Sequence, residues 1–298
     1  MPANTPDARP APPTGAVIVP AHNEERVIER TLHRLLPLLA HDTVEVIVVV
    51  NGSTDGTAAA ARHVPGVTVI ESGIGSKPAA MNLGDAAATR WPRLYLDADI
   101  DVEPEAVEAV FRSLADPRGP LAARPASVID TSASSFPVRA YYRARARIPE
   151  RGTRLWGAGL YAVSREGHER FDAFADVTAD DSWFDALFAE DEKEVLPTSP
   201  ARVHAPTNTA ALLAILSRHR RGYVELDGDA AAQSTDRVAA LLRTIRGPRS
   251  AFDACCYAAL AAAARLRTRR TVGAGTRRWE TDGTTRAGRP AHGTVGAR

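Results

Sequence analysis

The sequence predicts an α/β fold in which a mainly parallel sheet is flanked by helices. Over the first hundred residues, short apolar runs alternate with segments whose apolar residues recur at helical spacing, a pattern typical of parallel sheets covered by helices. The run VEVIVVV at 44–50 is almost wholly apolar, as expected for a strand buried on both faces. With 298 residues, of which 44% are hydrophobic, the chain can bury the core of one elaborated domain.

Strand and helix alternate regularly up to residue 116. Strands are predicted at 16–20, 44–50, 67–71 and 93–96, and helices at 24–36, 53–64, 77–90 and 104–116. Asn23 is expected to cap the first helix, and Ser53 or Thr54 the second. Pro78 and Pro104 suit the first turns of the third and fourth helices. In open sheets of this type, ligands bind beyond the carboxyl ends of the strands.

The pattern is less regular after residue 120. We expect a strand at 121–129, a basic helix at 138–148, a short strand within 157–167, a helix that begins near 178, and helices at 207–226, 234–246 and 251–270. The last of these is amphipathic and ends in a cluster of arginines. We interpret it as a helix that packs on the body, with contact to a membrane surface as the alternative.

Composition and charge restrict the class of protein. The net charge is +1, which gives no general attraction to nucleic acid, and no nucleic-acid partner is expected. Cys255 and Cys256 are adjacent and cannot form a disulfide framework, and no signal peptide or long apolar run is visible. These features predict a cytoplasmic protein, or one located peripherally at the inner face of a membrane.

The segment RLYLDADIDVEP at 93–104 places three carboxylates directly after the fourth predicted strand. In extended backbone, Asp97 and Asp99 point to the same side, and Ala98 points away. A hard divalent cation such as Mg²⁺ or Mn²⁺ prefers such oxygen ligands and commonly keeps substrate phosphates as its other ligands. The alternative is a solvated acidic loop that caps the next helix.

Three further polar segments follow predicted strands or begin predicted helices. They are PAHNEE at 20–25, NGSTDGT at 51–57 and GIGSKPAAMNLG at 73–84. The second leads into a helix N-terminus, which suits polar or anionic ligand groups. The third matches neither a dinucleotide fingerprint nor a P-loop. It contains Lys77, one of two lysines in the chain, which can meet a phosphate. Each segment, taken alone, is also explained by ordinary capping or a surface position.

The order and spacing of these four segments resemble family 2 glycosyltransferases, whose fold is of the GT-A type. The positions that match the family's motifs are Pro20, Asn23, Glu24, Asn51, Gly52, Ser53, Asp55, Lys77, Ala80, Asn82, Gly84, Asp97, Asp99 and Pro104. Two departures stand out: Val50 replaces an Asp that often contacts the nucleobase, and the lysine motif is one residue longer than usual. Base recognition is therefore expected to be shifted or relaxed.

The resemblance implies roles for particular residues. The family places an acid pair about eighty residues after its D-x-D motif, which points to Asp180 and Asp181, with Asp181 as the base that deprotonates the acceptor hydroxyl. The implied metal ligands are Asp97 and Asp99, with His204 as a third ligand or as a structural histidine. The implied donor-binding residues are Pro20, Ala21, Asn23, Glu24, Asn51, Ser53, Lys77, Asp97, Ala98, Asp99, Gly157, Arg218 and Arg221.

The resemblance also implies an activity and a domain organisation. The predicted activity is transfer of a sugar from a nucleotide-diphosphate sugar to an acceptor hydroxyl of a small or lipid-linked molecule, metal-assisted and inverting. The alternatives are a catalytically degenerate nucleotide-sugar binder and a sugar-1-phosphate nucleotidyltransferase. We divide the chain into a disordered leader (1–14), a nucleotide-sugar half (15–116), an acceptor and catalytic half (117–230), C-terminal helices (231–268) and a flexible tail (269–298).

Overall fold

The computed structural model describes residues 13–40, 42–149, 152–225 and 239–271. Seven strands are formed: β1 (Gly15–Ala21), β2 (Val44–Asn51), β3 (Val67–Ser72), β4 (Arg93–Leu96), β5 (Ala122–Asp130), β6 (Leu160–Val163) and β7 (Lys193–His204). The helices are α1 (Ile28–Leu39), α2 (Thr57–Arg62), α3 (Lys77–Ala87), α4 (Pro104–Ala115), α5 (Phe136–Arg147), α6 (Arg165–His168), α7 (Asp180–Ala186), α8 (Thr209–Glu225) and α10 (Pro248–Thr271), with a 3-10 turn at Glu190–Glu192. Most of the predicted leader and tail, and part of the predicted helix 234–246, lie outside the described residues.

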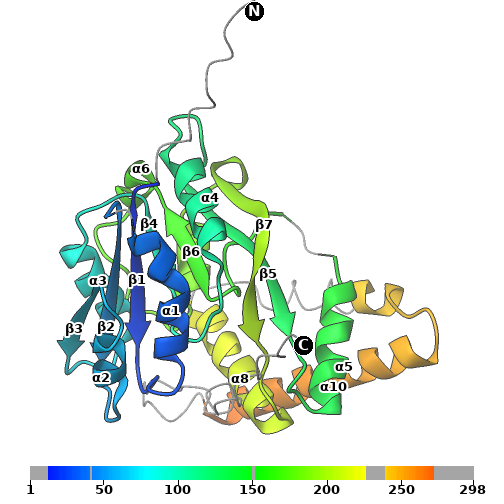
Figure 1. The fold of residues 1–298 in the computed structure, drawn as a ribbon. Helices are drawn as coiled ribbons and strands as arrows, with labels where there is room; N and C mark the ends of the chain where they lie inside the picture. Colours follow the sequence, from blue (N-terminus) through cyan, green and yellow to red (C-terminus); the bar gives the residue numbers. More distant parts are fainter. Residues whose placement is uncertain (1–12, 41, 150–151, 226–238, 272–298) are drawn as a thin grey trace, which may run out of the picture.

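The seven strands form one sheet in the order β3-β2-β1-β4-β6-β5-β7. Strands β1 to β4 run parallel to one another, and β5 is parallel to β7. Only β6 runs antiparallel to its neighbours β4 and β5. The predicted mainly parallel sheet flanked by helices is therefore confirmed (Figure 1).

Both faces of the sheet are buried. On one face, the strands pack against α1 and α4 through side chains such as Leu32, Leu35, Val107 and Phe111. On the other face, α3 and a group of aromatic residues cover the strands. This aromatic group contains Tyr95, Tyr161, Phe171, Phe174 and Phe184. Burial on two faces explains why the central strands are almost wholly apolar.

Two predicted helix starts are wrong. Helix α1 begins at Ile28, four residues after the expected start, and Asn23 does not cap it. Helix α2 begins at Thr57, and neither Ser53 nor Thr54 caps it. In both cases, the polar side chains form hydrogen bonds between loops. The predictions for α3 and α4 are confirmed, with a proline in the first turn of each.

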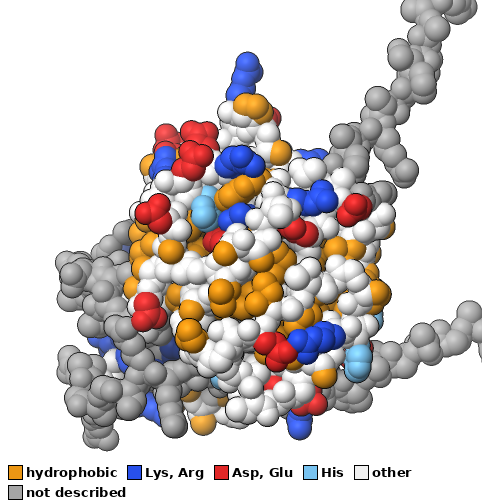
Figure 2. Space-filling model, turned by 90° about the vertical axis from the view of Figure 1, so that its left-hand side faces the viewer, with side chains coloured by type: hydrophobic (Ala, Val, Ile, Leu, Met, Phe, Trp, Pro, Cys, Tyr) orange, Lys and Arg blue, Asp and Glu red, His pale blue; other side chains and the backbone are white. Residues whose placement is uncertain are grey.

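Strand β3 forms one edge of the sheet. Figure 2 shows this side of the molecule, where apolar side chains gather across the middle of the face. The large apolar side chains most exposed around β3 and α3 are Ile74 (63%) and Leu83 (40%).

Helices α5, α8 and α10 pack together; in Figure 1, α5 lies on the far side of the sheet from β3, and α8 lies below the middle of the sheet. Val138 and Tyr141 of α5 pack with Leu212 of α8, and Tyr257 and Leu260 of α10 lie against this cluster. The predicted C-terminal helix that packs on the body is confirmed as α10. None of the helices within the described ranges is both long and apolar enough to cross a bilayer.

Candidate active site at the carboxyl edge of the sheet

The polar segments singled out from the sequence meet at one edge of the sheet. Strands β2, β1 and β4 are neighbours and run parallel, so their carboxyl ends lie side by side. The PAHNEE loop follows β1, the NGSTDGT loop follows β2, and the DAD segment follows β4. The fold therefore brings together three motifs that are separated by up to about eighty residues in the sequence.

The loops after β1 and β2 are held together by direct hydrogen bonds. The backbone N–H of Asn23 donates to Oγ of Ser53 at 3.0 Å, and the N–H of Thr54 donates to Oδ1 of Asn23 at 2.8 Å. Asn23 adopts a φ of 54°, a left-handed conformation that asparagine tolerates better than most residues. The side chains predicted to bind the donor thus also fix the shape of the loops that carry them.

Asn51 is the most unusual polar residue of this edge. It is fully buried, and neither its amide oxygen nor its amide nitrogen has a hydrogen-bond partner among the described residues. Its backbone carbonyl lies 2.6 Å from Nδ1 of His22. An unsatisfied buried amide costs about 1–3 kcal/mol, so Asn51 is well suited to bind a polar group of a ligand.

The DAD segment has the predicted alternation. Asp97 and Asp99 are partly exposed, whereas Ala98 is 3% exposed and packs in the core. The carbonyl of Ala98 accepts a hydrogen bond from Oγ1 of Thr31 at 2.8 Å. This hydrogen bond occupies the carbonyl of Ala98, which leaves mainly its N–H to contact a sugar-nucleotide donor. The buried side chain of Ala98 has a packing role. Pro20 and Ala21 are likewise buried within β1.

Lys77 connects the DAD segment to the acid pair. Its Nζ lies 2.7 Å from Oδ1 of Asp97 and 3.0 Å from Oδ2 of Asp180. Burial by itself lowers the pKa of Lys77, but the charges of Asp180 and Asp97 outweigh burial and raise the pKa above its ordinary value. Lys77 is therefore positively charged within the site, and the alternative of a surface lysine is wrong.

The acid pair begins helix α7. Asp180 is buried and accepts a hydrogen bond from the hydroxyl of Tyr161 at 2.8 Å. Asp181 accepts a hydrogen bond from the N–H of Gly157 at 2.8 Å. Burial and the charge of Asp180 raise the pKa of Asp181 above its ordinary value, while Lys77 opposes the shift. A carboxylate with a raised pKa is a better proton acceptor, which suits a general base.

The residues at the DAD segment fit a divalent cation with phosphate co-ligands. Mg²⁺ is usually held by one or two carboxylates together with substrate phosphates, and Asp97 and Asp99 supply two carboxylates. Within the described ranges, no three His, Cys, Asp or Glu side chains converge so as to hold a metal without such co-ligands.

His204 is engaged elsewhere. Its Nε2 lies 3.0 Å from Asp101 Oδ2, and its Nδ1 lies 3.8 Å from Asp130 Oδ2. Asp101 also pairs with Arg30 at 3.2 Å. Burial raises the pKa of Asp101, but the hydrogen bond to His204 and the charges of nearby arginines outweigh it and lower the pKa. The structure thus places His204 in an ion-pair network behind the DAD segment.

Arg218 and Arg221 lie on α8, which borders the acid pair. A Cβ added to Gly222 would meet Cβ of Ala179, the residue before Asp180, at 2.5 Å. The close approach requires a glycine at this point of α8. It places the helix that carries both arginines next to the predicted base.

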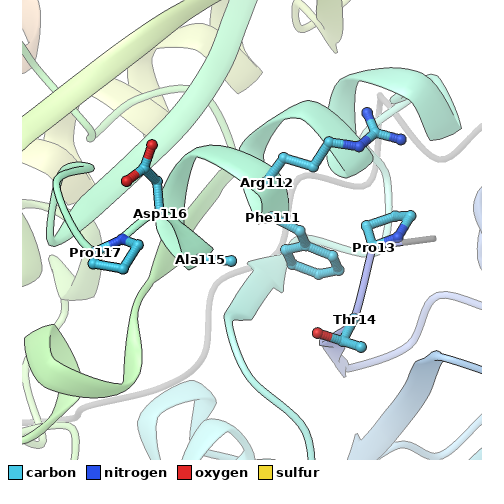
Figure 3. A pocket seen from close by; sticks show the side chains of 7 residues that line it. All are labelled: Pro13, Thr14, Phe111, Arg112, Ala115, Asp116 and Pro117. Carbon is cyan, nitrogen blue, oxygen red and sulfur yellow. The ribbon is translucent and has the colours of Figure 1, made fainter. Parts of the chain in front are cut away.

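A shallow hollow of about 470 Å³ lies away from this site. Figure 3 shows its lining, which includes Thr14 at the start of β1 and Phe111, Arg112 and Asp116 at the end of α4. Because Thr14 precedes β1 and the polar loops follow it, the hollow lies at the opposite end of the sheet. We assign it no ligand.

Sequence reasoning missed Tyr161, His22 and the role of Asp101. Tyr161 lies within an apolar strand, and nothing in the sequence distinguishes it from a core aromatic residue. Asp101 was visible as the third acid of DADID, and its spacing of two from Asp99 was the available signal. Its partners, Arg30 and His204, come from distant elements.

Two solved glycosyltransferases are similar to this chain in fold. The mannosyltransferase PcManGT from Pyrobaculum calidifontis, solved with GDP-Man and Mn²⁺, aligns with a TM-score of 0.57 at 23% identity, covering 89% of this chain and 76% of that one. Glucosyl-3-phosphoglycerate synthase from Mycobacterium tuberculosis, solved with Mn²⁺, UDP and glucosyl-3-phosphoglycerate, aligns with a TM-score of 0.50 at 22% identity, covering 69% and 80%. The fold is thus that of GT-A glycosyltransferases.

A protein-family model built on sequence also matches part of the chain. Residues 16–159 match the model of glycosyl transferase family 2. This segment, which runs from β1 to the residue before β6, matches that family, so the resemblance drawn from the motifs is confirmed. None of the curated proteins matches the sequence.

Proposed function

We propose that the protein transfers a sugar from a nucleotide-diphosphate sugar to an acceptor hydroxyl, with inversion at the anomeric carbon. The observation that carries this proposal is the position of Lys77, which contacts both Asp97 and Asp180 at the carboxyl edge of the sheet. The ammonium group of Lys77 therefore links the residue predicted to bind the metal and phosphate, Asp97, to the acid pair that contains the predicted general base.

On the side that binds the sugar nucleotide, the buried amide of Asn51 supplies one hydrogen-bond donor group and one acceptor group for the base or ribose. The paired loops at Asn23 and Ser53 hold the walls of this region in place. Charge builds on the diphosphate as the glycosidic bond breaks, and a positive group nearby stabilises it. Lys77 stays protonated and serves this role, and a divalent cation held by Asp97 and Asp99, when bound, supplies further electrostatic stabilisation.

On the acceptor side, Asp181 accepts the proton of the attacking hydroxyl. The N–H of Gly157 fixes one carboxylate oxygen of Asp181, which orients the group. Gly157 has a φ of 79°, a conformation open to glycine at little cost. A base on one side of the sugar and a leaving diphosphate on the other favour direct displacement, and hence inversion.

The two alternatives are less well supported. A nucleotidyltransferase would carry a Gly-rich basic loop after its first strand, where this chain has AHNEE. A catalytically degenerate nucleotide-sugar binder is the alternative to test, because Val50 stands where the family often has an aspartate that contacts the nucleobase. It would bind nucleotide sugars without turnover.

The proposal is tested by a thermal-shift screen followed by an assay of turnover. UDP, GDP and dTDP and their sugars are added with and without Mn²⁺, and a ligand that binds the native state raises Tm by mass action. Release of nucleotide diphosphate from the stabilising sugar nucleotide is then measured. No stabilisation by any nucleotide would contradict the proposal, and stabilisation without turnover would favour the degenerate binder.

A further inference from the structure

Helix α10 has apolar residues on two sides. Its inner side packs against α5 and α8 through Ala254, Tyr257 and Leu260. Its outer side is exposed and carries Phe252, Cys255, Ala258, Ala259, Ala262 and Leu266. We call this set the outer stripe. Each member lies three or four residues from another member, so they form one face of the helix.

Exposed apolar side chains concentrate on and around this helix. Phe252 of the outer stripe lies with its ring centroid 5.4 Å from that of Phe136 on α5. These two side chains are 46% and 54% exposed. Of the eight large apolar side chains that are exposed within the described residues, five lie on α5, on α10 or between residues 239 and 247. Such a concentration marks an interaction surface.

The same region is strongly basic. Residues 239–271 contain seven arginines and one acidic residue, and α5 contains four arginines and no acid. The one acidic residue, Asp253, is fully buried and paired with Arg143 and Arg147, each at 2.7 Å. No exposed carboxylate on α5 or on the described residues of α10 therefore offsets the arginines.

Arginines also border the outer stripe. At 100° per residue, Arg249 and Arg267 fall on one border of the stripe and Arg265 falls on the other. Arginine can bury its aliphatic stem beside apolar surface and extend its guanidinium to anionic groups. An apolar face with arginines at its margins is typical of helices that lie in the interface of an anionic membrane.

We propose that the outer stripe of α10, together with Phe136, docks the protein on an anionic membrane surface. Phe252, Phe136 and Leu266 enter the interface, and the bordering arginines contact lipid phosphates. A second copy of the chain is a poorer occupant, because a two-fold contact would bring the same basic margins of two copies together. Helix α10 packs on α8 at Leu212, and α8 reaches the acid pair further along, where its Gly222 contacts Ala179.

The test is co-sedimentation of the full chain with vesicles. Phosphatidylcholine vesicles are compared with vesicles that also contain phosphatidylglycerol, at low and high salt. We expect binding to the anionic vesicles only, and weaker binding at high salt. Leu266→Glu is expected to reduce binding ~tenfold or more. Leu83→Glu is the matched control, since it places the same charge at an exposed leucine of α3, and it is expected to bind like the wild type.

The possible outcomes are distinct. Equal binding to both vesicle types, or unchanged binding by Leu266→Glu, would overturn the proposal. So would a dimer in light scattering that Leu266→Glu dissociates while vesicles fail to bind. Nucleotide binding is measured on the same preparations by thermal shift. A protein that binds nucleotide but no vesicles contradicts the docking surface alone, and the reverse result contradicts only the proposed transferase.

Discussion

Polar side chains find their partners differently in two parts of the molecule: the loops at the carboxyl edge of the sheet, and the arginine-rich helices α5 and α10. At the sheet edge, polar groups from different loops bond one another, as Asn23 does with Thr54. Around α10, two arginines share one buried carboxylate, and large apolar side chains stay exposed. The first arrangement preorganises a site for a small polar ligand, whereas the second leaves a broad basic and apolar surface. The chain thus holds two regions of different chemistry, which we propose to serve the recognition of different partners.

The largest effect is expected from Asp181→Asn in the first region. Loss of a general base typically costs about 10²–10⁴-fold in rate, and the amide keeps the shape of the site. We expect kcat to fall by that order while nucleotide binding is retained, as measured by turnover and thermal shift. Because an ionised group with a raised pKa opposes folding at neutral pH, the Tm should not fall.

Asp191→Asn serves as the control for this variant. Asp191 is exposed and lies outside the site, so its variant should retain wild-type turnover. Full activity of Asp181→Asn would remove Asp181 from the mechanism.

Lys77→Met removes the positive charge that contacts both Asp97 and Asp180. Loss of one preorganised charge-stabilising group costs about 10²–10³-fold in kcat. The variant also leaves Asp97 and Asp180 without their shared cation. We therefore expect a loss of about 10²-fold in kcat/KM, with Lys77→Arg recovering part of it. An unchanged kcat/KM in the methionine variant would show that the diphosphate is stabilised elsewhere.

In the second region, Asp253→Ala tests how α10 is attached. Hydrogen bonds to charged groups contribute about 1.5–3 kcal/mol, and the two arginines are partly exposed, which reduces the loss. We expect a decrease of ~2 kcal/mol in the free energy of unfolding, seen in urea denaturation. Nucleotide binding should not change. A loss of nucleotide binding in this variant would contradict the separation of the two regions.

The smallest effect concerns pH. Asp181 must be ionised to act as a base, and its pKa is raised by burial and by the charge of Asp180. Activity should therefore fall as pH decreases through a value above the ordinary pKa of aspartate. Asp180→Asn removes one cause of the shift, so the acid limb of kcat/KM should move to lower pH. An acid limb that stays in place or moves to higher pH would argue against Asp181 as the titrating group.

The sequence predicted the structure of residues 15–116 far better than that of the rest. Strands such as β2 and helices such as α4 were predictable because local pattern and burial agree in them. The helix starts at α1 and α2 were not, since Asn23 and Ser53 bond across loops and not along the chain. Lys77, Asp97 and the acid pair were predicted to serve one site, but their connection through a single ammonium depends on distant elements meeting. Tyr161 had no sequence signal separate from an ordinary core aromatic residue, whereas the arginine-flanked helix that carries the outer stripe was visible in the sequence.

The hydrogen bonds between the loops after β1 and β2 have a consequence for protein engineering. Oδ1 of Asn23 accepts a hydrogen bond from the N–H of Thr54, and the N–H of Asn23 donates to Oγ of Ser53, so exchanging one loop alone alters contacts that hold the other. Chimaeras that alter donor choice by grafting segments from relatives should therefore transplant both loops as a matched pair.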